Sequence, residues 1–135
     1  MSYGSAVALQ AAIWQRLSSD AGLLALTGGA VFDALPPGDT PGTFVVIGPE
    51  EVRDASDRSG PGAEHRLVIS VISDAPGFAG AKAAAVAVSD ALAGAELVLA
   101  RGRLAGLWFE RARAERIDAR GLRRIDLRFR ARIEG

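Results

Sequence analysis

The C-terminal sequence RRIDLRFRARIEG, residues Arg123 to Gly135, carries the clearest structural pattern in the chain. Every second side chain in it is apolar: Ile125, Leu127, Phe129, Ala131 and Ile133. The positions between them are charged: Arg124, Asp126, Arg128, Arg130 and Arg132. A strict period of two predicts a strand with one face in a hydrophobic core and the other face exposed. The exposed face would carry a row of arginines, and the role of that row is the main question the sequence raises.

The preceding segment LAGLWFERARAER, residues 104–116, is predicted to pair with this strand in a C-terminal β-hairpin. Matching the apolar faces places Phe109 opposite Phe129 across a three-residue loop, Asp118–Arg120. The same register sets four further pairs: Leu107 with Ala131, Trp108 with Arg130, Glu110 with Arg128, and Ala112 with Asp126. It leaves Arg111 and Arg113 on the apolar side near the tip of the hairpin, which makes a protruding basic tip a predicted contact element.

Two helices are expected earlier in the chain. Ser5 is predicted to cap a helix over Ala6–Leu17, whose apolar stripe is formed by Leu9, Ile13 and Leu17. A short helical turn is expected over Asp20–Leu26. The second main helix is expected over Phe78–Ala93, with a stripe of mostly alanine that would let it lie close against a sheet.

Strands are expected at Ala30–Ala34, Thr43–Gly48, Ala63–Ser73 and Glu96–Ala100, from their β-branched and apolar runs. The polar segment Pro49–Gly62, which ends in Gly-Pro-Gly, is predicted to be a long loop. Together these elements predict a single α+β domain over residues 1–135. Its antiparallel or mixed sheet would have two main helices packed on one face.

The composition excludes several classes of protein. The chain of 135 residues has no cysteine, so disulfides, thiolate nucleophiles and zinc thiolate sites are excluded. Its apolar runs are too short for a membrane span, and no basic signal region precedes the first helix. We therefore expect a soluble protein of cytosolic origin.

The net charge of zero conceals a division along the chain. Residues 101–135 hold eleven arginines against five acidic residues, a net charge of +6, whereas residues 1–100 hold five basic against eleven acidic residues, −6. This asymmetry is compatible with charge pairing inside the fold, with a surface for nucleic acid, or with complementarity between copies of the chain.

No catalytic constellation is apparent. The single histidine, His65, is interpreted as an ordinary strand residue, and the sequence GFAGAK at Gly77–Lys82 lacks the Ser or Thr that a phosphate loop needs. The adjacent acids Glu50 and Glu51 are interpreted as solvated, and no GxSxG motif occurs. We predict no enzyme, no cofactor and no metal site. Direct nucleic-acid binding is disfavoured because Phe129 points away from the arginines, whereas single-strand binders interleave the two.

The ordered segments of the whole chain resemble a known family. They are ALQAAIWQRLSSDAGLLALTGGAVFDALPPG, TFVVIG, GAEHRLVISV, AKAAAVAVSDAL, LAGLWFERAR and GLRRIDLRFRA. This succession resembles the tail-completion, or tail-terminator, family of long-tailed bacteriophages, prophages and gene transfer agents. The sharpest pieces are GAEH before the third strand and RFRA in the last.

The resemblance implies a structural virion protein that forms a ring, commonly hexameric, at the head-proximal end of the tail tube. Such a ring stops tube polymerisation and meets the head-tail connector. Its implied partners are other copies, the tube protein and the connector. DNA would pass through without sequence-specific binding, and no membrane is involved. The implied location is the tail of a particle assembled in the bacterial cytoplasm. Two alternatives are a head-tail adaptor or stopper of the same particle, and an unrelated α+β module that binds protein or nucleic acid.

Candidate contact residues follow from the charge pattern. The arginine row is expected to lie at a seam between subunits or to line the channel, and the seam is favoured because a conduit should not hold its DNA. The polar segment 49–62 is the second candidate contact. The full set is Glu50, Glu51, Arg53, Asp54, Asp57, Arg58, Arg111, Arg113, Arg124, Arg128, Arg130 and Arg132.

Overall fold

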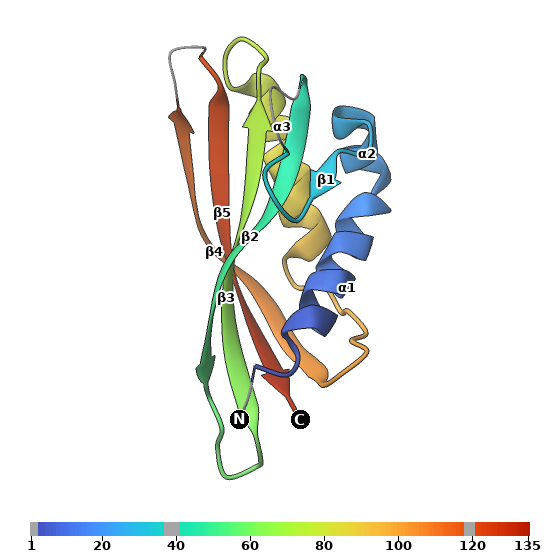
Figure 1. Cartoon of the computed structure of the whole chain (residues 1–135), viewed down its shortest axis with the longest axis vertical. Coiled ribbons are helices and arrows are strands. Elements are labelled where there is room, and N and C mark those ends of the chain that lie inside the picture. The colour runs from blue at the N-terminus through green and yellow to red at the C-terminus, as the bar shows by residue number, and fades with distance from the viewer. Residues whose placement is uncertain (1–2, 37–40, 118–120) are drawn as a thin grey trace.

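The computed structural model describes residues 3–36, 41–117 and 121–135 (Figure 1). Its helices are α1 (Ala6–Ser18), α2 (Ala21–Thr27) and α3 (Ala79–Leu92). Its strands are β1 (Val31–Phe32), β2 (Thr43–Asp54), β3 (Gly62–Ser73), β4 (Arg103–Arg116) and β5 (Arg123–Glu134). They form one sheet in the order β1-β2-β3-β5-β4, in which β1 is parallel to β2 and the other pairs are antiparallel. The predicted α+β class with a mixed sheet is confirmed.

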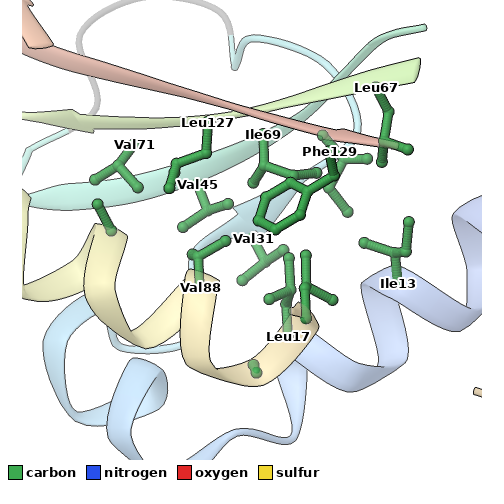
Figure 2. Packing of buried hydrophobic residues seen from close by; sticks show 14 of the residues in the cluster. Ile13, Leu17, Val31, Val45, Leu67, Ile69, Val71, Val88, Leu127 and Phe129 are labelled. Carbon is green, nitrogen blue, oxygen red and sulfur yellow. The ribbon is translucent and has the colours of Figure 1, made fainter. Parts of the chain in front are cut away.

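The core lies between the sheet and the helices α1 and α3, which cover the same face of the sheet (Figures 1 and 2). The alternation in β5 is confirmed, since Ile125, Leu127, Phe129, Ala131 and Ile133 are all buried. Phe129 is 0 % exposed and packs among side chains of α1 and α3. Alanines at the buried face of α3 keep that helix close to the sheet. Burial of each large side chain contributes about 1.5–3 kcal/mol.

The predicted long loop at residues 49–62 is wrong. β2 continues to Asp54 and β3 begins at Gly62, so only residues 55–61 turn between them. The pairing slips between Ile47 and Glu50, where Gly48 has a φ of 110° and is joined to Pro49 by a cis peptide bond. A bulge on a strand whose outer edge is largely free accommodates this Gly-Pro pair without ending the strand. Strands β2 and β3 form a hairpin, and its polar half, residues 50–67, is called the arm below.

Three smaller expectations are also corrected. Residues 96–100 form no strand, although Leu97 and Leu99 pack against the core from an irregular segment. The strand expected at Ala30–Ala34 is only two residues long. Ser5 precedes α1, but its side chain makes no capping hydrogen bond. Asp20 does cap α2, since its carboxylate accepts a hydrogen bond from the Leu23 N–H at 2.9 Å.

The register of the C-terminal hairpin is confirmed from Gly106 to Phe109, whereas a bulge at Ala105 shifts the pairing before it, so that Leu104 lies opposite Ile133. Phe109 lies opposite Phe129, with their rings edge to face at a centroid distance of 5.9 Å, Leu107 lies opposite Ala131, and Trp108 lies opposite Arg130.

Beyond Phe109 the register prediction is wrong, because a bulge at Glu110 shifts the pairing by one residue. Arg111, not Glu110, therefore lies opposite Arg128, and Arg113, not Ala112, lies opposite Asp126. The bulge moves Arg111 and Arg113 off the apolar side. The predicted loop at Asp118–Arg120 lies outside the described residues.

Candidate functional site

The arginine row lies on the side of the sheet opposite α1 and α3, which we call the open face. Cross-strand partners extend this face over the three neighbouring strands β3, β5 and β4. On the β3 side, the pairs are Glu64 with Arg132, Arg66 with Arg130, and Val68 with Arg128. On the β4 side, the pairs are Trp108 with Arg130, Arg111 with Arg128, and Arg113 with Asp126. Because β5 lies between β3 and β4, the row runs parallel to the β4 edge of the sheet, one strand in from it.

Three of the four arginines in the row bind groups of their own chain. The Arg130 guanidinium lies over the Trp108 ring, 4.5 Å from its centroid. Arg132 donates to the Ala55 carbonyl at 2.9 Å and to the Asp57 carboxylate at 3.2 Å. Arg124 donates through Nε to Asp126 at 2.9 Å. Much of the positive charge of β5 is thus compensated within the fold.

Glu64 is the acidic centre of the open face. Its buried carboxylate accepts a hydrogen bond from Arg53 Nε at 3.0 Å and lies 3.4 Å from Arg66 and 3.9 Å from Arg130. Burial opposes ionisation of this carboxyl, but the hydrogen bond from Arg53 and the three positive charges outweigh it and lower its pKa below the ordinary value. The sequence prediction missed Glu64, although its place in the β3 alternation, across from arginines, was a usable signal.

Two opposed arginines on the open face have no ion-pair partner among the described residues. Arg111 and Arg128 lie directly opposite each other, an unfavourable arrangement for like charges. They line a shallow hollow of about 190 Å³ together with Arg113, Glu115 and Asp126. Arg113 itself binds Glu115 at 3.3 Å. The hollow is therefore a basic spot that suits an acidic group from outside the chain.

The candidate residues from segment 49–62 all lie on the arm: Glu50, Glu51, Arg53 and Asp54 belong to strand β2, and Asp57 and Arg58 lie in the turn at residues 55–61. Glu51 and Arg53 share the open face with the arginine row, and Arg53 binds Glu64. Asp57 binds Arg132 near the tip, where Arg58 also lies. Asp54 accepts a hydrogen bond from the Ser56 hydroxyl, which lowers the pKa of Asp54. The structure thus joins part of the arm to the arginine row.

Glu50 faces the other way, toward the start of α1. It accepts a hydrogen bond from the Tyr3 hydroxyl at 2.6 Å, and this bond and the Glu50 charge raise the pKa of Tyr3. A second Glu50 oxygen lies 3.4 Å from Nδ1 of His65, which is fully buried. Nε2 of His65 has no hydrogen-bond partner within the described residues.

Among the described residues, no three His, Cys, Asp or Glu side chains gather closely enough to hold a metal ion. No helix in the same part of the chain is both long enough and apolar enough to cross a membrane. The chemistry that the open face offers is charge pairing and stacking, which are means of recognition.

Comparison with known proteins gives the class to which this fold and this charged face belong. Residues 11–134 match the family described as tail completion protein gp17, and the chain belongs to that family. It is therefore a structural tail protein. No match is found among curated proteins.

A solved structure indicates which kind of particle carries a protein similar to this one. The chain is similar to a chain in the structure titled "Virion of native gene transfer agent (GTA) particle". The two are 65 % identical, the match covers 99 % of this chain and 100 % of that one, and the TM-score is 0.92. The resemblance on which the sequence analysis rested is confirmed.

Proposed function

We propose that this protein forms a ring of six copies that caps the head-proximal end of a tail tube in a gene transfer agent or phage particle. The ring stops tube polymerisation and offers its opposite surface to the head-tail connector. The observation that carries the proposal is the full-length similarity, at 65 % identity, to a chain of a gene transfer agent virion. Membership of the tail completion family supports the same role.

The shape of the sheet supports assembly into a ring. A closed ring of identical subunits needs two different surfaces that fit each other. The sheet has two unlike edges: β1 and β2, next to α1, form one, and the long strand β4 forms the other (Figure 1). Copies placed side by side would bring the β4 edge of one subunit against the β1–β2 edge of the next.

The basic hollow around Arg111 and Arg128 is the part of the arginine row that remains available to another subunit or to the tube protein. Arg124, Arg130 and Arg132 would contribute less, because their charges already meet Asp126, Glu64 and Asp57. DNA passes through such a ring without sequence-specific contacts. The arm carries the acidic candidates Glu51, Asp54 and Asp57, which make it the second proposed contact.

Electron microscopy of particles made without this protein tests the proposal. We expect overlong tails that lack heads, and normal particles when the wild-type gene is restored. Tails of normal length beside heads that fail to retain DNA would contradict it, and would instead assign the protein to a head-tail adaptor or stopper.

A further inference from the structure

Helix α1 carries a second apolar stripe that its own chain covers only in part; the Trp14 indole N–H donates to the Val31 carbonyl at 3.1 Å, while much of the stripe stays exposed. Leu9, Ile13 and Leu17 face the core, whereas Val7, Ala11 and Trp14 follow one another at helical spacing along a flank of the same helix. Val7 is 83 % exposed and Trp14 is 45 % exposed. An isolated apolar side chain on a surface is ordinary, but three on one helix flank form a surface that suits a partner.

A hollow of about 340 Å³ runs beside this stripe. Its lining residues are Tyr3, Ala6, Val7, Gln10, Ala11, Asp33 and Glu50. The two charged residues of the lining are both acidic, and Asp33 makes no ion pair within the described chain. The stripe and the hollow together are called the α1 surface.

The C-terminal half of β4 is a part of the sheet whose helix-side face is not covered by any helix of the described residues. Ala112 and Ala114 lie opposite Leu127 and Ile125, so they belong to the helix-covered side of the sheet, yet both are exposed. Phe109, on the same side, is 43 % exposed. The helices of the chain do not reach this part of the sheet, which Figure 1 shows at the edge away from α1.

A basic residue completes this uncovered strip. Arg116 is exposed beyond Ala114 and makes no ion pair with any described residue. Phe109, Ala112, Ala114 and Arg116 are called the β4 strip. A sheet face with apolar residues is normally buried beneath a helix.

The two surfaces are complementary in each respect. One is a helix flank with an apolar stripe and a carboxylate, Asp33, that has no ion-pair partner among the described residues, and the other is an uncovered sheet face with apolar side chains and an unpaired arginine. Both belong to the helix side of the molecule, and they lie toward opposite edges of the sheet order. The chain cannot bring its own α1 over its own β4 strip, but a second copy placed alongside can.

We propose that the α1 surface of one copy covers the β4 strip of the next copy, so that the helix layer continues from subunit to subunit. The apolar stripe Val7, Ala11 and Trp14 packs on Phe109, Ala112 and Ala114, and Arg116 meets the carboxylate of Asp33. This inference rests on the proposed ring and specifies its subunit contact. The contact is heterologous, as a closed ring requires.

Cross-linking between two engineered cysteines tests the contact, because the chain has no cysteine of its own. Val7→Cys and Ala112→Cys proteins are mixed and treated with a short bis-maleimide. We expect a cross-linked heterodimer. The matched control pairs Ala112→Cys with Val98→Cys, which is 95 % exposed and outside both surfaces. That pair should give no product above background. Equal yields from the two mixtures would overturn the proposed contact.

Charge reversal gives a second test that does not depend on cross-linking. Asp33→Arg or Arg116→Asp should each weaken subunit association by about tenfold, measured by analytical ultracentrifugation, and the double variant should regain most of it. Val7→Glu should weaken association at least as much without altering the far-UV spectrum.

The outcomes separate this inference from the proposed function. If the wild type assembles and all these variants assemble equally well, the ring stands and the contact is wrong. If the wild type stays monomeric at every concentration, both proposals fail.

Discussion

The two faces of β5 show how differently one strand can use its alternate residues. Its apolar face is fully packed, and Phe129 at its centre is 0 % exposed. Its charged face stays half-exposed and is held by ion pairs and by the stack of Arg130 on Trp108. Most of the arginine row therefore stabilises the fold, and only its portion around Arg128 remains free for a partner.

Truncating a side chain on the packed face of β5 should have the largest effect on the free energy of unfolding. Phe129→Ala should lower the free energy of unfolding by about 3–5 kcal/mol, because it removes a fully buried ring and leaves a cavity. Phe109→Ala is the matched control, since its ring contacts Phe129 but is 43 % exposed, and it should cost less than half as much. Urea denaturation followed by circular dichroism measures both. Similar losses for the two variants would mean that the core is not centred on Phe129.

The acidic centre of the charged face should give the next largest effect. Glu64→Gln should lower the free energy of unfolding by about 1–3 kcal/mol at pH 7, since it leaves Arg53, Arg66 and Arg130 without their shared carboxylate. The pKa of Glu64 is lower in the folded protein than in the unfolded chain. Its contribution is therefore complete above the unfolded pKa of about 4.3 and is lost as the pH falls through the folded pKa.

The pH dependence of this variant provides its own control. The difference in unfolding free energy between wild type and Glu64→Gln should shrink as the pH is lowered from about 5 to about 3. If this difference in unfolding free energy does not change with pH, the ion pairs of Glu64 do not stabilise the protein.

The stack of Arg130 on Trp108 of β4 should contribute less to the free energy of unfolding. Trp108→Leu should cost about 0.5–1 kcal/mol, the size of an exposed cation–π contact. Arg130→Gln should cost a similar amount, and the double variant should lose less than the sum of the two. Additive losses in this cycle, measured by urea denaturation, would show that the Arg130–Trp108 pair has no interaction energy.

The free part of the charged face should matter least for folding. Arg128→Glu should change the unfolding free energy by no more than about 0.5 kcal/mol, and removal of the like-charge contact with Arg111 favours a small gain. The same variant should weaken ring assembly if Arg128 lies at a contact. Unchanged assembly of both Arg128→Glu and Arg130→Glu would refute a role for the row between subunits.

The residues that sequence reasoning placed correctly are those whose burial follows a regular period. The alternation in β5 and the four-residue spacing of Leu9, Ile13 and Leu17 in α1 each define a single buried face. The Phe109–Phe129 pair was also predictable, because aligning two apolar faces allows few registers.

The two largest errors occur where a local irregularity changes the pattern. Gly48 and Pro49 looked like the end of a strand but form a bulge, and the bulge at Glu110 turned Arg111 and Arg113 to the open face. A one-residue insertion leaves no compositional mark, so alternation alone does not reveal it. The acidic centre at Glu64 and the uncovered β4 strip depend on which strands are neighbours in the sheet. That strand order is determined by the fold of the whole chain, so no local sequence pattern predicts it.

Native mass spectrometry of the unmodified protein, over a range of concentrations, measures whether the protein forms a ring of six copies. We expect a closed assembly of six copies of the 14.0 kDa chain, with open intermediates only at low concentration. A protein that stays monomeric throughout, or that forms only a symmetric dimer, would contradict the proposed ring.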